Sequence, residues 1–305
     1  MITIDKGTLP LVSIRVLTYN SSRYIVETLD SVFQQTYPNI ELVISDDCSK
    51  DNTVDVCKAW IEAHGSRFKN VIFLTVPQNT GVCANSKRSL EATTGDWIKG
   101  LGGDDCFYPN AIEEFVRFVQ EQRCEICACR MDYMDENSKD LDVKPTFARR
   151  DYIKDLQKPY REQYRMIKEK LIVPGPVLFY SRKVYEMTGG PDPKYGSADE
   201  WSFVYKVLKA GYRIMLLDKI LLRYRYNPES LSRSMKMDSN HIYVKNVRLF
   251  MKDVLIRDSF RNGEPFLSWH LYLLYLKMGN LGNNKMKILN ILDPFWYVEK
   301  IKNKK

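Results

Sequence analysis

The chain has 305 residues, of which 44% are hydrophobic and 28% charged, and its formal net charge is +8. This is the composition of an ordinary globular protein, and the length suits one large domain or one domain with an appendage. Residues 1–10 lack the basic start and apolar core of a signal peptide, and no apolar run is long enough to span a membrane. We therefore expect a cytoplasmic protein.

The cysteines do not predict a metal site. Three of the seven, Cys124, Cys127 and Cys129, lie close together in a strand-like run, but they have no distant second pair of ligands. We expect reduced, packed thiols.

Between residues 11 and 133, strand-like apolar runs alternate with helix-like periods, which predicts a parallel sheet covered by helices. The expected strands are 11–17, 40–45, 71–76 and 97–101. Helices are expected from about residue 22 until shortly before Tyr37, after a cap at Asp51 or Asn52, and over residues 81–92.

Each predicted strand ends in a polar cluster. The clusters are Thr18-Tyr19-Asn20, Asp46-Asp47, Gln78-Asn79-Thr80-Gly81 and Gly103-Asp104-Asp105. Parallel strands bring such clusters to one edge of the sheet, where ligands bind in open α/β folds. Hydroxyl, amide and carboxylate groups suit a nucleotide, whereas the glycine-rich motifs of dinucleotide enzymes and P-loop NTPases are absent.

The last cluster places two adjacent acids after two glycines. The glycines permit a sharp turn and a close approach of the backbone to a ligand. Asp104 and Asp105 repel each other, and a hard divalent cation such as Mg²⁺ or Mn²⁺ would relieve that repulsion. A solvated turn is the alternative interpretation.

These motifs together resemble family 2 glycosyltransferases with the GT-A fold. The matching residues are Val12 to Asn20, Gln35 to Tyr37, Glu41 to Asp51, Asn79-x-Gly81, Ala92-x-x-Gly95-Asp96-Trp97-Ile98 and Gly103-Asp104-Asp105. The resemblance implies an α/β, Rossmann-like, mostly parallel sheet flanked by helices over residues 1–235. A nucleotide-sugar half would cover about 1–134, and an acceptor half about 135–235. It also implies sugar transfer from a nucleotide-sugar, usually a UDP-sugar, with inversion.

The resemblance assigns candidate nucleotide-binding residues. They are Thr18, Tyr19, Asn20, Asp46, Asp47, Asn79, Lys87, Gly103, Asp104 and Arg225. Asp47 would accept a hydrogen bond from the base. Three residues have alternatives: Asp46 would shape its loop, Lys87 would lie on a solvated helix face, and Arg225 would be a surface charge rather than a contact of the diphosphate.

The family's metal motif usually reads Asp-x-Asp-Asp, and Gly102 stands at its first position here. The resemblance therefore leaves Asp104 as the direct ligand of Mn²⁺ or Mg²⁺, with Asp105 helping.

A second acidic pair, Asp199-Glu200, resembles the Glu-Asp pair that supplies the family's catalytic base. Counted back from Gly211, Glu200 falls at the position of the catalytic Asp, and Asp199 falls on the preceding Glu. The order of the two acids is reversed, so either could be the base, and we favour Glu200. The alternative is a structural role at a helix N-terminus.

The segment between the two halves, residues 141–170, is rich in charges and aromatics. We expect a lid or binding loop that frames the acceptor.

We expect residues 236–305 to form a basic, helical C-terminal extension. After Ser234 there are 13 Lys and Arg against 6 Asp and Glu, a net charge of +7. Phe295, Trp296 and Tyr297 lie beside several lysines, which suits the anionic inner face of a membrane. Packing against the catalytic domain, with a solvated Lys tail, is the alternative.

The first functional prediction is an inverting glycosyltransferase for surface polysaccharide synthesis, acting on a saccharide or lipid-linked saccharide and not on nucleic acid. A sugar-phosphate nucleotidyltransferase is second, although it would need a glycine-rich, Arg-containing loop where Thr18 to Ser22 stand. A non-catalytic nucleotide-sugar-binding protein is third.

Overall fold

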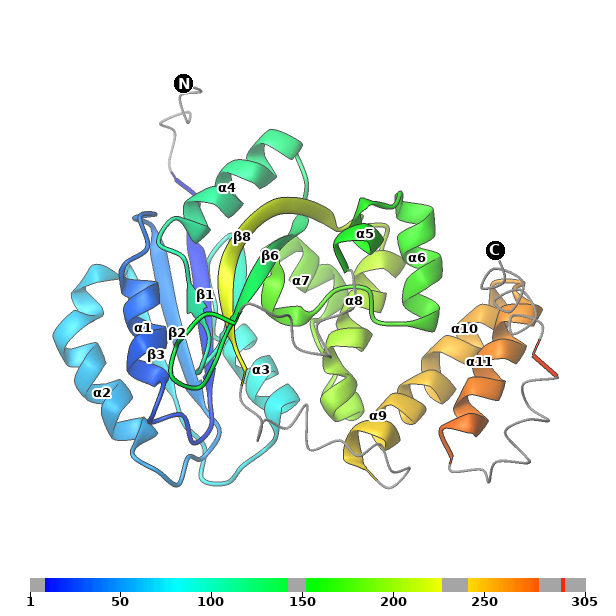
Figure 1. Cartoon of the computed structure of the whole chain (residues 1–305), viewed down its shortest axis with the longest axis horizontal. Helices are drawn as coiled ribbons and strands as arrows, with labels where there is room; N and C mark the ends of the chain where they lie inside the picture. The colour runs from blue at the N-terminus through cyan, green and yellow to red at the C-terminus, as the bar shows by residue number, and fades with distance from the viewer. Residues whose placement is uncertain (1–8, 142–151, 227–240, 280–291, 294–305) are drawn as a thin grey trace.

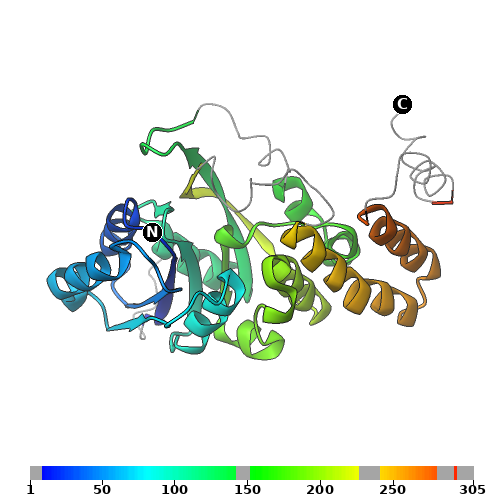
Figure 2. The ribbon, with the colours of Figure 1, turned by 90° about the horizontal axis from the view of Figure 1, so that it is seen from below.

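The computed structural model describes residues 9–141, 152–226, 241–279 and 292–293. A central sheet is flanked by helices, and the C-terminal helices extend beyond the second half of the chain (Figure 1). A view from below shows the same arrangement, with the sheet between layers of helices (Figure 2).

Four parallel strands form the first half of the sheet. They are β1 (Val12–Thr18), β2 (Ile40–Asp46), β3 (Asn70–Leu74) and β4 (Trp97–Gly102), in the spatial order β3-β2-β1-β4. All four were expected from the sequence. Every residue of β2 is buried because helices cover both faces of the sheet.

The second half adds four strands and completes the order β3-β2-β1-β4-β7-β6-β8-β5. Strand β7 (Leu178–Ser181) is antiparallel to both β4 and β6 (Ile126–Met134). Strand β8 (Met215–Arg225) is parallel to β6 and antiparallel to the short β5 (Cys106–Phe107). Most of the strand pairs are therefore parallel, and the expected architecture of a helix-flanked α/β sheet is confirmed.

The helices of the first half are amphipathic and pack against the sheet. They are α1 (Ile25–Phe33), α2 (Thr53–His64), α3 (Val82–Glu91) and α4 (Ala111–Gln122). Helix α3 contacts β1 and β2, and α1 contacts α2. The expected thiols also pack: Cys127 and Cys129 are buried in β6, and Cys124 is partly buried just before it.

The expectation of a loop is wrong for residues 152–169, and a role of this stretch in framing the acceptor stays a prediction. This stretch forms α5 (Tyr152–Gln157) and α6 (Tyr160–Glu169), while residues 142–151 lie outside the described residues. The charged composition concealed a buried face that includes Leu156 and Ile167. The Gln163 amide also bonds backbone carbonyls of residues 156, 158 and 214, which ties α6 to its neighbours.

The acceptor half continues with α7 (Arg182–Thr188), a 3₁₀ segment at Pro193–Ala198, and α8 (Asp199–Lys209). The C-terminal extension follows as α9 (Ile242–Phe250), a π-helical turn at Met251–Leu255, α10 (Ile256–Arg261) and α11 (Pro265–Lys277). Helix α9 packs against the 3₁₀ segment. The predicted boundaries near residues 134 and 235 stay predictions.

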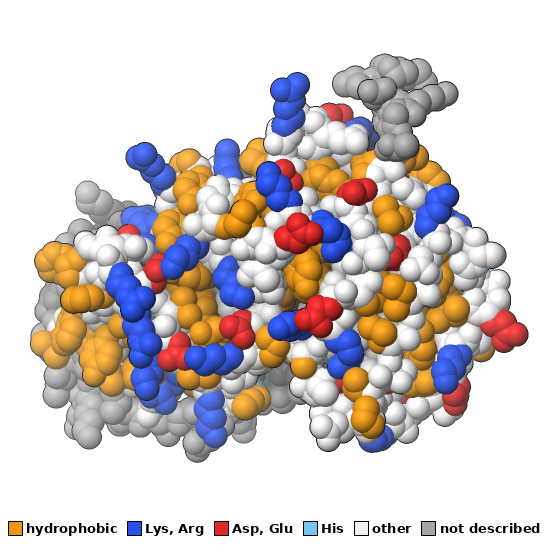
Figure 3. All heavy atoms as spheres, turned by 180° about the vertical axis from the view of Figure 1, so that it is seen from behind, with side chains coloured by type: hydrophobic (Ala, Val, Ile, Leu, Met, Phe, Trp, Pro, Cys, Tyr) orange, Lys and Arg blue, Asp and Glu red, His pale blue; other side chains and the backbone are white. Residues whose placement is uncertain are grey.

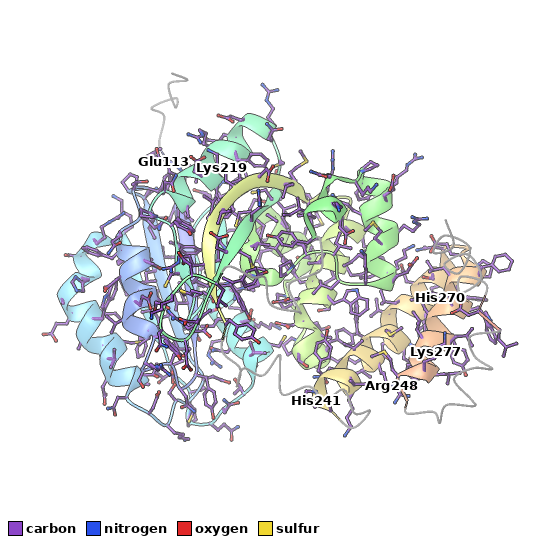
Figure 4. The ribbon with its side chains drawn as sticks, viewed as in Figure 1. Glu113, Lys219, His241, Arg248, His270 and Lys277 are labelled. Atoms are coloured by element: carbon purple, nitrogen blue, oxygen red, sulfur yellow. The ribbon has the colours of Figure 1, made fainter. Side chains whose placement is uncertain are left out.

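The C-terminal helices dock on the acceptor half through ion pairs. Each pair joins an acid of the extension to a lysine of the acceptor half: Asp253 with Lys194, Asp258 with Lys209, and Glu264 with Lys168. Within the extension, the Arg248 guanidinium lies 4.5 Å from the ring centre of Tyr275. Figure 4 shows Arg248 of α9 near the end of α11 that carries Lys277. The acids of these helices are therefore directed inward.

Candidate active site

The polar clusters after β1, β2 and β4 meet at one edge of the sheet, as expected. The Thr18 hydroxyl donates to Asp46 Oδ2 (2.9 Å), and the Asp47 N–H donates to the Thr18 carbonyl (3.0 Å). The Gly103 N–H donates to the Leu17 carbonyl (2.8 Å). Backbone and side-chain bonds thus join the three loops into one rigid rim.

Asp47 holds in place the remaining polar cluster, which follows β3. Its buried carboxylate accepts bonds from the Thr80 hydroxyl (2.5 Å), the Gly81 N–H (2.7 Å) and the Arg88 guanidinium (3.2 Å). Burial by itself raises the pKa of Asp47, but these bonds outweigh it and lower the pKa below its ordinary value. The carboxylate is therefore an anion that anchors the loop before α3. Its predicted contact with the base stays a prediction.

Asp46 shapes its loop, which was the alternative interpretation. It is fully buried and accepts the Ser49 N–H (2.9 Å) and hydroxyl (2.5 Å) as well as Thr18. Asn20 has a φ of 50°, and its side-chain carbonyl accepts the Lys50 N–H (2.8 Å). Both residues stabilise the backbone of the rim, and their contacts with a nucleotide stay predictions.

Other predicted nucleotide contacts are more exposed. Tyr19 is 46% exposed at the rim, and the Asn79 side chain accepts the Gly81 N–H (3.1 Å). Lys87 pairs with Glu91 on the same helix face (3.9 Å), as its alternative interpretation expects. A ligand could reach Tyr19 without breaking any buried bond.

Arg225 is the largest fully buried side chain among the residues that the structure describes, so its interpretation as a surface charge is wrong. Its Nε donates to the Asp104 carbonyl (2.8 Å), Nη1 donates to the Ser138 hydroxyl (2.9 Å), and Nη2 pairs with Glu27 (2.5 Å). Its backbone N–H donates to Asp105 Oδ1 (2.9 Å). Arg225 therefore fixes the acidic turn to the end of β8, and its contact with diphosphate stays a prediction.

Asp104 and Asp105 are an enclosed pair of acids. Burial raises the pKa of both, and the charge of Asp104 raises that of Asp105 further, although Arg225 and Lys99 act in the opposite direction. Asp105 is 3% exposed, and Asp104 is half-buried at the rim. The pair would gain from an added positive charge.

The glycines before the acids are required by close contacts. A Cβ at Gly103 would lie 3.0 Å from the Leu17 carbonyl oxygen and from Ser21 Oγ. A Cβ at Gly102 would lie 2.9 Å from Asp104 Oδ1. Because Gly102 has no side chain, the Asp104 carboxylate occupies the space where the family's first Asp would begin.

The donor set fits a cation that is shared with phosphate. Among the described residues, no three His, Cys, Asp or Glu side chains come together as a metal site. Mg²⁺ is usually held by one or two carboxylates together with substrate phosphates, and Asp104 with Asp105 can supply that protein share.

Asp199 and Glu200 open α8, where the N-cap residue is Ala198. Burial raises the pKa of Asp199 to about 6, despite the nearby Glu200 N–H and the Arg15 charge. Burial and the charge of Asp199 raise the pKa of Glu200 to about 7, despite a hydrogen bond from the Gly175 N–H. Carboxyls with pKa values near neutrality suit proton transfer more than helix capping.

Gly175 is a site residue that the sequence did not reveal. It begins the 3₁₀ turn Gly175–Val177, and a Cβ there would lie 2.6 Å from Glu200 Oε1 and 2.9 Å from Glu200 Cδ. The Glu200 carboxylate thus rests directly on this backbone. No local sequence pattern shows which side chain packs on this turn.

The eight-stranded, helix-flanked sheet with its polar loops at one edge is an architecture of the GT-A type. The model of "Glycosyl transferase family 2" matches residues 13–187. The chain therefore belongs to glycosyl transferase family 2.

Known relatives agree with this class. "Putative teichuronic acid biosynthesis glycosyltransferase TuaG" of Bacillus subtilis is 31% identical over 133 residues, 44% of this chain and 51% of that protein. "Putative glycosyltransferase EpsE" of the same organism is 32% identical over 114 residues, 37% of this chain and 40% of that protein. The chain thus matches about half or less of the length of these relatives.

Solved structures confirm the GT-A fold. S. aureus TarS 1-349 in complex with UDP-GlcNAc has a TM-score of 0.65 at 17% identity, over 96% of this chain and 88% of that chain. The mannosyltransferase PcManGT from Pyrobaculum calidifontis, in complex with GDP-Man and Mn²⁺, has a TM-score of 0.59 at 17% identity, over 90% and 74%.

Gly175→Ala should misplace the Glu200 carboxylate, because the new Cβ would lie only 2.6 Å from Glu200 Oε1. A misplacement of about 1 Å can cost about a hundredfold in rate, so the initial rate of sugar transfer should fall by about that factor. The control is Gly65→Ala, where φ is −59° and the nearest atom to a new Cβ, on Ile61, lies at 3.4 Å. Equal rates in the two variants would show that catalysis does not depend on the packing of Glu200 against Gly175.

Proposed function

We propose that this protein is an inverting glycosyltransferase that moves a sugar from a UDP-sugar to a saccharide acceptor in surface polysaccharide synthesis. The observation that carries the proposal is the presence of two separate acid pairs with raised pKa values. Asp104 and Asp105 follow β4, and Asp199 and Glu200 begin α8. Direct displacement needs the leaving group and the base on opposite sides of the anomeric carbon.

The donor end of the site is the rim formed by the loops after β1, β2, β3 and β4. Tyr19 and the anchored loops would hold the base and ribose, while Asp104 with Asp105 would hold Mn²⁺ or Mg²⁺ against the diphosphate. When bound, that ion supplies positive charge to the departing UDP. The complexes of TarS with UDP-GlcNAc and of PcManGT with GDP-Man and Mn²⁺ support this assignment.

The acceptor end is built around Glu200. A hydroxyl is a poor nucleophile at neutral pH, and a base works best when its pKa is close to the working pH. Glu200, with a pKa of about 7, meets this condition, while Asp199, with a pKa of about 6, is more fully ionised. We assign proton removal to Glu200 and electrostatic support to Asp199.

The surface polysaccharide is proposed from the relatives. TuaG is named for teichuronic acid biosynthesis, and a saccharide or lipid-linked saccharide acceptor would suit that chemistry. The nucleotidyltransferase alternative is disfavoured by family membership and by the loop after β1, where Thr18, Asn20 and Ser21 are tied by hydrogen bonds to the β2 loop and Thr53. A non-catalytic binding protein would bind UDP-sugar but would release no UDP from it.

Asp104→Asn should abolish Mn²⁺-dependent UDP binding, because the amide removes one of the two anionic ligands. Calorimetric titration of UDP, with and without Mn²⁺, measures the effect, and UDP release from UDP-sugar should fall with it. Asp218→Asn is the matched control, since that exposed acid pairs with Arg130 instead. Unchanged UDP affinity and UDP release in Asp104→Asn would remove this acid from the donor site.

Glu200→Gln should lower turnover by about a hundred- to ten-thousand-fold with UDP binding intact, because it removes the base and nearly keeps its shape. Asp199→Asn should lower turnover less. Steady-state rates of both variants at saturating donor measure the difference. A larger loss in Asp199→Asn would make Asp199 the base, and full activity in both would end the proposed mechanism.

The same Gln variant has a stability signature that confirms its folding. The folded pKa of Glu200, about 7, lies above the ordinary unfolded value of about 4.3. The wild type therefore loses stability as pH rises from about 4.3 to about 7, and Glu200→Gln lacks that loss. The variant should gain melting temperature relative to wild type at pH 8, and much less near pH 4.5.

We also propose that the C-terminal extension associates with an anionic membrane surface. No helix in the described parts of the chain is both long and apolar enough to cross a membrane. The acids of the extension face inward, whereas Lys252, Arg257 and Arg261 are exposed. Exposed aromatics accompany them, with Phe266 at 72% and Trp269 at 44%.

Figure 3 shows exposed hydrophobic side chains beside a line of Lys and Arg over these helices. Such a mixture suits anionic headgroups and the membrane interface. The predicted aromatic and Lys-rich end, Phe295 to Lys305, lies outside the described residues.

Lys252→Gln with Arg257→Gln should weaken binding to anionic vesicles by about tenfold or more, since each basic residue near such a surface is worth on the order of 1 kcal/mol. Co-sedimentation with vesicles of anionic or neutral lipid measures it. The control pair is Lys58→Gln with Lys69→Gln, which are exposed in the nucleotide half. Equal partition into both kinds of vesicle would leave the extension only its packing role.

A further inference from the structure

Lys99 is a buried cation with no obvious structural purpose. It lies in the middle of β4, is 0% exposed, and forms no ion pair among the described residues. A lone ammonium in the interior costs several kcal/mol unless its donors are satisfied. Burial lowers the pKa of Lys99 to about 8.

The Lys99 ammonium is held by backbone carbonyls. Its Nζ donates to the Pro176 carbonyl and, within β4, to the Gly100 carbonyl (3.1 Å). The rings of Phe107 and Phe115 lie 5.3 and 5.6 Å away. The Pro176 bond joins β4 to the 3₁₀ turn Gly175–Val177, which β4 contacts directly.

The Glu200 carboxylate, the proposed base, packs against this turn. The peptide N–H of Gly175 donates to the Glu200 carboxylate, and Gly175 leaves no room for a Cβ beside it. Pro176 is the next residue, so a bond to its carbonyl restrains the backbone on which Glu200 rests. Lys99 and Glu200 are thus linked through two consecutive residues.

We infer that Lys99 is a positioning residue that fixes the Gly175–Pro176 turn and thereby sets the place and basicity of the Glu200 carboxylate. The inference rests on the proposed role of Glu200 as the base. It also explains why a cation is kept inside β4: the strand that leads into the turn with Asp104 and Asp105 would hold the second acid pair in register with the first.

Lys99 and Glu200 each have their own charged and titratable neighbours. Lys99 is influenced by Arg15, Asp105, Cys127 and Cys129. Burial and the charge of Asp199 raise the pKa of Glu200, and the Gly175 N–H lowers it. Lys99 bonds the carbonyl of the next residue, Pro176, so the turn is the route by which Lys99 would act on Glu200.

The test is a double-mutant cycle of Lys99→Met and Glu200→Gln, read as turnover at saturating UDP-sugar. In the wild-type background Lys99→Met should lower turnover by about ten- to a hundredfold. In the Glu200→Gln background it should have no further effect, because the group it positions is gone. An equal loss in both backgrounds would overturn the inference.

The pH profile of turnover gives a second readout. Loss of the Gly175 N–H bond should raise the pKa of Glu200, so the rising limb near pH 7 should move upward in Lys99→Met. If the rising limb of the pH profile did not shift, the proposed link from Lys99 through the turn to Glu200 would be contradicted.

Lys99→Gln, which keeps an N–H donor, should retain more turnover than Lys99→Met. An equal loss of turnover in the two variants would also contradict the proposed link from Lys99 to Glu200. If Glu200→Gln itself kept full turnover, the base assignment would fail first, which separates the two claims.

Discussion

The site depends on four partly or fully buried carboxyls whose negative charges are compensated in two separate pairs. Two lie after β4 and two at the start of α8, and burial raises the pKa of all four. Each pair is offset by fixed groups: the Arg225 N–H and guanidinium at the first, and the Gly175 N–H and Arg15 charge at the second. Because the two pairs have separate partners, one can serve a metal and diphosphate while the other serves a hydroxyl.

Other acids at the same edge serve the protein instead. Asp46 and Asp47 are buried and accept several hydrogen bonds each, which fixes the loops after β1 and β3. Hydrogen bonds lower the pKa of Asp47, which is the opposite of the shift at Asp105 and Glu200. The pKa of Asp47 therefore shifts in the direction that suits an anchoring anion, and the pKa values of Asp105 and Glu200 shift in the other.

Much of the fold could be predicted from local pattern. The apolar runs of β1, β2 and β4 are bounded by polar residues, so their positions agree with expectation to within a residue. The stretch 152–169 was misjudged because its buried positions, such as Leu156 and Ile167, are separated by charged residues that outnumber them.

The acids of the candidate site could be predicted from the sequence. The residues that hold those acids in place could not. Asp104 and Glu200 stand out because carboxylates beside glycines or at a helix start carry a chemical meaning. Gly175, Lys99 and the buried state of Arg225 depend on contacts between segments far apart in the chain. No local sequence pattern predicts which backbone carbonyl a lysine or arginine side chain will bond.

The proposed mechanism is direct displacement with Glu200 on the side opposite the leaving UDP, and the stereochemistry of the product tests it. Proton NMR of the saccharide formed from an α-linked UDP-sugar reports the configuration of the new bond through the anomeric coupling constant. Direct displacement gives a β-linked product, and an α-linked product would exclude it.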